Sequence, residues 1–77
     1  MNSIATPILC DDEWSNAFRH LLRNKLTFYE FKAGFDNYFF QILQDGKYLH
    51  FRTVYDGKII KDDLRMFDTY YQYVWYR

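Results

Sequence analysis

The chain has 77 residues, of which 49% are hydrophobic, and ten Lys and Arg residues balance ten Asp and Glu residues. This length predicts a single compact domain, residues 1–77. The absence of net charge excludes the strong positive field of a general nucleic-acid binder and also excludes an acidic mimic of DNA.

Aromatic residues make up 23% of the chain, with eight Phe, eight Tyr and two Trp. Each aromatic side chain can bury roughly 150–250 Å². The rings of this chain together have more surface than one small core can enclose. We therefore expect some of them to form exposed clusters, and such clusters mark interfaces.

The single cysteine, Cys10, excludes a disulfide framework and indicates a reducing compartment. The first ten residues contain no basic region, and the apolar stretch around Ile8 is too short for a signal peptide or a membrane span. We therefore expect a cytoplasmic protein that does not insert into a membrane.

Residues 11–25 have the pattern of an amphipathic helix that begins at Asp11. Asp11 is expected to cap this helix, and two further acidic residues suit the positive end of its dipole. The apolar residues recur every three or four positions, which places them on one stripe: Trp14, Ala17, Phe18, Leu21 and Leu22.

The middle of the chain has the signals of an antiparallel meander. Residues 26–33 are rich in β-branched and aromatic residues and predict a strand. Residues 38–43 and 48–55 flank Asp45-Gly46, a strong signal for a two-residue type I′ turn. Asp56-Gly57 repeats that signal before residues 58–60, which predicts a possible fourth strand.

A two-residue turn at Asp45-Gly46 would fix the register of the first hairpin. Facing residues share a side of the sheet, so one face is apolar and is expected to lie under helices: Phe40, Ile42, Leu49 and Phe51. The opposite face is mixed and is expected to meet a partner: Phe39, Gln41, Leu43, Tyr48, His50 and Arg52.

The C-terminal segment favours a helix capped by Asp62 or Asp63, although its Tyr, Val and Trp content also suits a strand. The helical stripe comprises Leu64, Phe67, Tyr71 and Val74, while Tyr73, Tyr76 and Arg77 would point away from the sheet. The predicted fold is α+β: an antiparallel three- to four-stranded meander with an N-terminal and a C-terminal helix packed on one face, in the order α-β-β-β-(β)-α.

Catalytic motifs are missing from the sequence, which predicts that the chain is not an enzyme. Cys10 has no histidine near it in sequence and is expected to be a small buried or half-buried apolar residue. The acidic pairs that could join His20 and His50 in a metal site are better explained as helix caps. Neither Ser3 nor Ser15 lies in a glycine-flanked elbow, and no loop could cradle a phosphate, so we expect no metal and no cofactor.

Nucleic-acid binding is the alternative function that the mixed face allows. The α-β-β-β-α order resembles that of the double-stranded-RNA-binding domain, and Phe39, Tyr48, His50 and Arg52 are residue types of a stacking platform. That family has a basic cluster at the start of its last helix, where this chain has Asp62-Asp63. Carboxylates at this position would repel phosphate.

Protein binding is the function that the sequence favours, because exposed Tyr, Trp, Phe and Arg are typical of interface hot spots. The candidate partner-binding residues are Phe39, Tyr48, His50, Arg52, Tyr73, Tyr76 and Arg77. The expected partner is a larger intracellular protein that the chain modulates or inhibits, and a homodimer could also bury the spare rings. By analogy of size and of a composition with AT-rich codons, the chain is similar to phage or mobile-element inhibitors of host defence, such as anti-CRISPR proteins.

Overall fold

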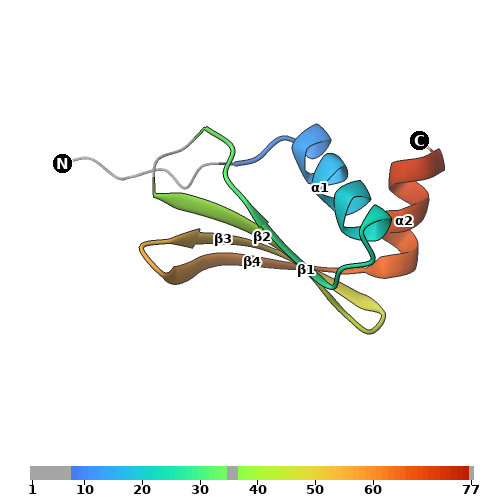
Figure 1. The fold of residues 1–77 in the computed structure, drawn as a ribbon. Coiled ribbons are helices and arrows are strands. Elements are labelled where there is room, and N and C mark those ends of the chain that lie inside the picture. Colours follow the sequence, from blue (N-terminus) through green and yellow to red (C-terminus); the bar gives the residue numbers. More distant parts are fainter. Residues whose placement is uncertain (1–7, 35–36, 77) are drawn as a thin grey trace.

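The structure is a computed structural model that describes residues 8–34 and 37–76. These residues form, in chain order, α1 (Asp11–Arg23), β1 (Phe28–Phe31), β2 (Tyr38–Asp45), β3 (Tyr48–Tyr55), β4 (Lys58–Met66) and α2 (Phe67–Tyr76). The strands form one antiparallel sheet in the order β1-β2-β3-β4, and the helices lie on the same side of it (Figure 1). The predicted α+β arrangement is confirmed, with the fourth strand present.

Helix α1 has the predicted stripe but a different cap. The residue that caps it is Cys10, which makes no side-chain cap hydrogen bond, so the prediction of an Asp11 cap was wrong. Cys10 is also exposed, contrary to the expectation that it is buried or half-buried. The acidic first turn of α1, and His20 and Arg23 in its last turn, match the two ends of the helix dipole.

The two hairpins use different turns. Tyr55 pairs with Lys58 around Asp56 and Gly57, whose φ angles of 52° and 77° are those of a type I′ turn. In the first hairpin Asp45 pairs with Tyr48, so its turn residues are Gly46 and Lys47. Of these, only Gly46 has a positive φ, of 60°, which is the pattern of a type II′ turn.

The predicted turn at Asp45-Gly46 was therefore wrong by one residue, and each predicted strand partner moves by two. Ile42 pairs with Phe51 instead of Leu49, and Phe40 pairs with Thr53. Side chains alternate with a period of two along a strand, so a shift of two residues changes the partners but keeps the faces. The apolar face is buried as predicted: Phe40, Ile42, Leu49 and Phe51.

Strand β4 is longer than predicted and contains both aspartates that were expected to cap the last helix. It runs to Met66, and α2 begins at Phe67, where the backbone N–H donates to the Lys47 carbonyl at 2.8 Å. The long β4 pairs with all eight residues of β3, and this backbone hydrogen bonding outweighs the capping signal of the aspartates. A register shift between Thr53 and Val54 marks a β-bulge near the start of β4.

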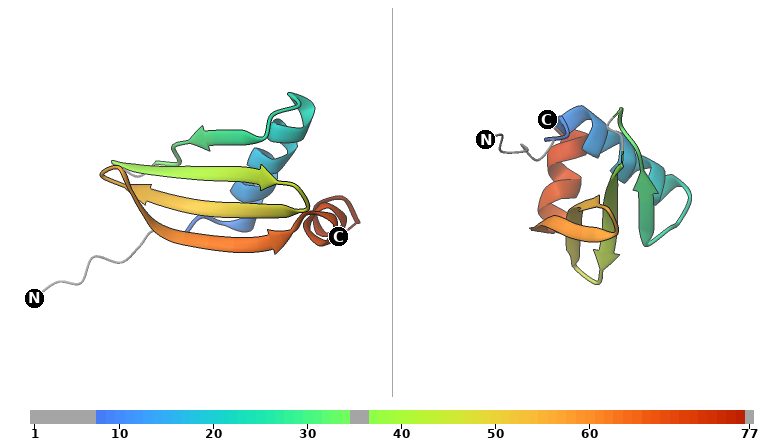
Figure 2. Two further views of the ribbon diagram at one scale, coloured as in Figure 1. Left: turned by 90° about the horizontal axis from the view of Figure 1, so that it is seen from below. Right: turned by 90° about the vertical axis from the view of Figure 1, so that its left-hand side faces the viewer.

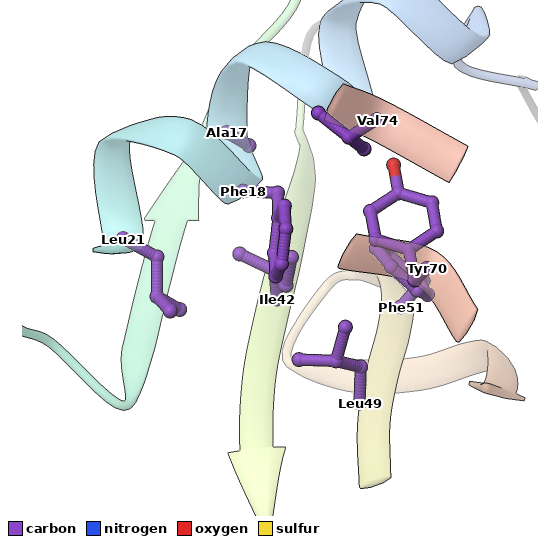
Figure 3. Packing of buried hydrophobic residues seen from close by; sticks show 8 residues of the cluster. All are labelled: Ala17, Phe18, Leu21, Ile42, Leu49, Phe51, Tyr70 and Val74. Carbon is purple, nitrogen blue, oxygen red and sulfur yellow. The ribbon is translucent and has the colours of Figure 1, made fainter. Parts of the chain in front are cut away.

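The core lies between the sheet and the helices and is largely aromatic. Figure 3 shows side chains from α1, β2, β3 and α2 meeting in one cluster. Phe18 is fully buried, and its ring centroid lies 5.0 Å from that of Tyr70 and 5.9 Å from that of Trp75. Such edge-to-face ring packing lets a small domain build a core from bulky side chains. No helix within the described residues is long and apolar enough to cross a membrane.

Candidate protein interface

The side of the sheet opposite the helices is the candidate site. The left view of Figure 2 looks at this side, and the strands lie in front of α1 with no described helix over them. Paired residues of neighbouring strands share a face, so the register assigns the side chains on this side. We call it the open face: Phe28, Glu30, Phe39, Gln41, Leu43, Tyr48, His50, Arg52, Val54, Ile59, Asp62, Leu64 and Met66.

A polar row crosses the middle of the open face. It runs across all four strands, in the order Glu30, Gln41, Arg52 and Asp62. The Gln41 Nε2 donates to Glu30 Oε2 at 2.9 Å, and the Arg52 Nε donates to Asp62 Oδ2 at 3.2 Å. The Nδ1 of His50 lies 3.1 Å from the other carboxylate oxygen of Asp62. The charged and amide groups of this row are therefore bonded to one another within the sheet.

Apolar side chains lie on both sides of the polar row. The next row toward α2 contains Phe28, Leu43 and Leu64 together with His50, and Met66 lies beyond it. Three of the most exposed large hydrophobic side chains belong to β4, with exposed fractions of 58% for Leu64, 52% for Ile59 and 50% for Met66. Contiguous exposed apolar groups with polar neighbours are typical of protein interaction surfaces.

The structure brings four of the predicted partner-binding residues together on the open face: Phe39, Tyr48, His50 and Arg52. Tyr48 is exposed, whereas Phe39 is half-buried, with Lys32 Nζ 5.1 Å from its ring centroid. Both His50 and Arg52 contact Asp62, so Arg52 is not a free cation. These four residues form one continuous surface.

Two of the other three predicted residues, Tyr73 and Tyr76, lie on α2 and not on the strands of the open face. Tyr73 lies on α2, and its hydroxyl donates to the Asp11 carboxylate at 2.8 Å. Tyr76 is 78% exposed near the end of the same helix. Arg77 lies outside the described residues. Within the described residues, Tyr73 approaches the open face at Met66, with which it lines one hollow.

The sequence reasoning missed the β4 residues of the open face. Leu64 was assigned to a helical stripe, and Ile59 and Met66 were not assigned to any surface. The alternation of Asp62, Leu64 and Met66 with Asp63 and Arg65 is a strand signal that could have identified them. It was obscured by the two adjacent aspartates, which are also typical of a helix start.

The acidic and histidine side chains do not gather into a metal centre in the described part of the chain. Residues 8–34 and 37–76 contain no group of three or more His, Cys, Asp or Glu side chains that could hold a metal ion. Asp62 is the ion-pair partner of Arg52, and Asp63 lies 3.7 Å from Lys61 Nζ. The carboxylates of Asp62 and Asp63 belong to opposite faces of β4, because successive side chains of a strand alternate.

No protein-family model, curated protein or solved structure matches this chain. The inference of a function therefore depends on the shape, charge and exposure of its surfaces.

Proposed function

We propose that the chain is a small non-enzymatic module that binds a larger intracellular protein through the open face and thereby modulates or inhibits it. The observation that carries this proposal is the exposure of Ile59, Leu64 and Met66 beside a polar row that is bonded internally. Apolar side chains supply the free energy of burial, and the polar row gives the surface a specific pattern.

The internal bonding of the polar row also lowers the cost of burying it. A buried polar group that loses its hydrogen bond to water costs about 1–3 kcal/mol if nothing replaces that bond. Gln41 and Arg52 already bond to neighbouring carboxylates, so a partner need not supply those bonds. Tyr48 adds an exposed aromatic ring, of the type enriched at hot spots.

Protein is favoured over nucleic acid because of the charges on the open face. Binding to phosphates requires cations that are free to replace counterions. The guanidinium of Arg52 is paired with Asp62, and Glu30 is a second carboxylate in the same row. These carboxylates would repel a phosphate backbone, whereas a protein surface can complement them.

The finer role, an inhibitor of host defence encoded by a phage or mobile element, is part of this proposal. It is supported by the small size of the chain, by its high content of amino acids whose codons are AT-rich and by the analogy with anti-CRISPR proteins. In this proposal the chain acts by occupying a surface of a larger protein. The open face has the apolar character that this mode of action needs.

The test compares the wild-type chain with a Leu64→Ala, Met66→Ala double variant. The tagged chain is used to isolate a partner from its source cells, and the partner is then purified so that its Kd and its activity can be measured. We expect the double variant to bind about tenfold to a hundredfold more weakly, because each truncated anchor loses more than about 1 kcal/mol. Ile8→Ala is the control for loss of an exposed apolar side chain outside the open face.

Two results would contradict the proposal. One is equal affinity of the double variant and the wild type for the purified partner. The other is the finding that no purified protein binds while DNA or RNA binds with an affinity that falls steeply with salt, as counterion release requires. The second result would establish the nucleic-acid alternative instead.

A further inference from the structure

A pocket of about 170 Å³ lies on the helix side of the sheet, where α1 and α2 leave the edge strand β4 uncovered. We call it the α2 pocket, and it is lined by Asp11, Trp14, Phe51, Arg65, Tyr70 and Tyr73. Arg65 projects to this side because it pairs with the buried Leu49. A second hollow shares Arg65, Tyr70 and Tyr73 and extends the pocket along α2 toward Met66 and Thr69.

The apolar walls of the α2 pocket are held in place by ring contacts. The centroids of Trp14 and Phe51 are 5.1 Å apart with their planes at 78°, and those of Phe51 and Tyr70 are 4.9 Å apart. The Tyr73 hydroxyl bonds to Asp11 and connects the two helices at the pocket. An apolar cavity of about 150 Å³ can hold one benzene ring. The α2 pocket therefore has the size and the rigid aromatic lining for a single aromatic side chain.

The α2 pocket has two charged side chains, Asp11 and Arg65, and they differ in whether they already have a bonding partner. The Asp11 carboxylate accepts the Tyr73 hydroxyl, whereas Arg65 has no ion pair and no hydrogen bond to any other described residue. A guanidinium presents paired donors that match the two oxygens of a carboxylate. An anionic group next to the ring-binding space would therefore find a partner in Arg65.

We propose that the α2 pocket binds an aromatic side chain of the partner protein and that Arg65 binds the carboxylate of an acidic residue next to it. This inference rests on the proposed function, because it takes the partner to be a protein, and it specifies the chemistry of the segment that is bound. Leu64 and Met66 of the open face flank Arg65 in sequence, so one partner can contact both sides of the edge strand there.

The two tryptophans provide a direct measurement. Trp14 lines the α2 pocket, while Trp75 stacks on Tyr71 at 4.7 Å and does not line it. The full chain is labelled with ¹⁵N and titrated with millimolar acetyl-Phe-Asp-amide, and the two indole N–H resonances are followed by NMR. We expect a saturable shift of the Trp14 signal, while the Trp75 signal stays in place.

Matched peptides and variants test each part of the proposal. Acetyl-Phe-Asn-amide and acetyl-Ala-Asp-amide lack the carboxylate and the ring, respectively, and each should bind about tenfold more weakly. Arg65→Gln should weaken acetyl-Phe-Asp-amide by about the same factor. Lys61→Gln is the control, because Lys61 lies on the same side of β4 but does not line the pocket.

The proposal is overturned if the Trp14 signal does not move. It is also overturned if acetyl-Phe-Asn-amide binds the wild type, or acetyl-Phe-Asp-amide binds the Arg65→Gln variant, as tightly as acetyl-Phe-Asp-amide binds the wild type. A stronger response to uridine monophosphate than to acetyl-Phe-Asp-amide would also overturn it, in favour of a nucleotide. Circular dichroism checks that each variant is folded. Failure here leaves the proposed function intact, because Leu64 lies on the other face of the sheet and lines neither hollow, so Leu64→Ala alone tests the open face.

Discussion

The hydroxyl of Tyr73 in α2 donates a 2.8 Å hydrogen bond to the carboxylate of Asp11 in the first turn of α1. The two residues are 62 positions apart in the chain, so this bond forms only when the helices are packed together. Asp11 is the first residue of α1 and Cys10 holds the cap position, so the Asp11 carboxylate is available for this bond. The bond also gives Tyr73 a structural role, because it connects α2 to α1.

A double-mutant cycle on this pair measures how strongly the bond couples the helices. Asp11→Ala, Tyr73→Phe and the combined variant are compared with the wild type by urea denaturation. We expect a coupling free energy of about 0.5–1.5 kcal/mol, because the acceptor is charged but both side chains are exposed to water. Tyr76→Phe is the control and should not change the unfolding midpoint. A coupling free energy near zero would show that the bond does not stabilise the domain.

The sequence predicted the α+β fold, the apolar stripe of α1 and the two faces of the hairpin. The faces were correct although the turn was misplaced, since the true register differs from the predicted one by two residues. A strand with Phe40 and Ile42 on one side can place them only on the core side, because burying Gln41 instead would cost free energy. Alternation of this kind is a local property that can be inferred from sequence.

The boundary between β4 and α2 could not be predicted from local signals. Asp62 and Asp63 suit a helix start, but the structure uses Asp62 to pair with Arg52 of the neighbouring strand. The start of α2 is fixed by the bond from the Phe67 N–H to the carbonyl of Lys47, a residue of the turn between β2 and β3. Both interactions join residues that are distant in sequence. Because these two interactions extend β4 to Met66, β4 supplies residues to both the open face and the α2 pocket.

Phe18 is the central ring of the core, and Phe18→Ala should remove a large part of the stability of the domain. It is fully buried and packs against the rings of Phe67, Tyr70 and Trp75. Truncation of a buried Phe costs about 3–5 kcal/mol, and a chain of this length has a total stability of about 4–12 kcal/mol. We expect a large fall in the urea midpoint, or an unfolded circular dichroism spectrum.

Phe28→Ala is the matched control for the loss of a ring. Phe28 lies on the open face and is 45% exposed, so its truncation should cost clearly less than that of Phe18. Equal destabilisation by the two substitutions would contradict the assignment of the core to the helix side of the sheet.

Gly46 allows the backbone of the first hairpin turn to be tested alone. Its φ is 60°, and a Cβ atom added there would meet no heavy atom within 4 Å. Gly46→Ala should therefore destabilise the domain by about 1–2 kcal/mol through backbone strain rather than through a clash. D-alanine at the same position, introduced by chemical synthesis, favours a positive φ and should retain or increase stability. Equal unfolding midpoints for the two alanine enantiomers would refute the type II′ assignment.

Tyr70 should make the stability of the domain depend on pH in the alkaline range. Burial raises the pKa of its phenol above the ordinary value of 10.0, the nearby Ser15 hydroxyl partly offsets this shift, and the Asp11 carboxylate adds to it. The Ser15 oxygen is buried without a hydrogen-bond partner among the described residues, so it acts on Tyr70 as a close dipole and not as a bonded group. The direction of the shift depends on burial, which favours the neutral phenol.

The folded chain therefore holds the Tyr70 proton more tightly than the unfolded chain does. This contribution to stability is fully present below the unfolded pKa of 10.0 and is lost as the pH rises from there through the folded pKa. We expect the free energy of unfolding of the wild type to fall more steeply than that of Tyr70→Phe as the pH rises above 10.0, measured by urea denaturation. Tyr76→Phe, which alters an exposed ring, should keep the wild-type slope. The same slope in Tyr70→Phe as in the wild type would show that the buried phenol is not the group responsible.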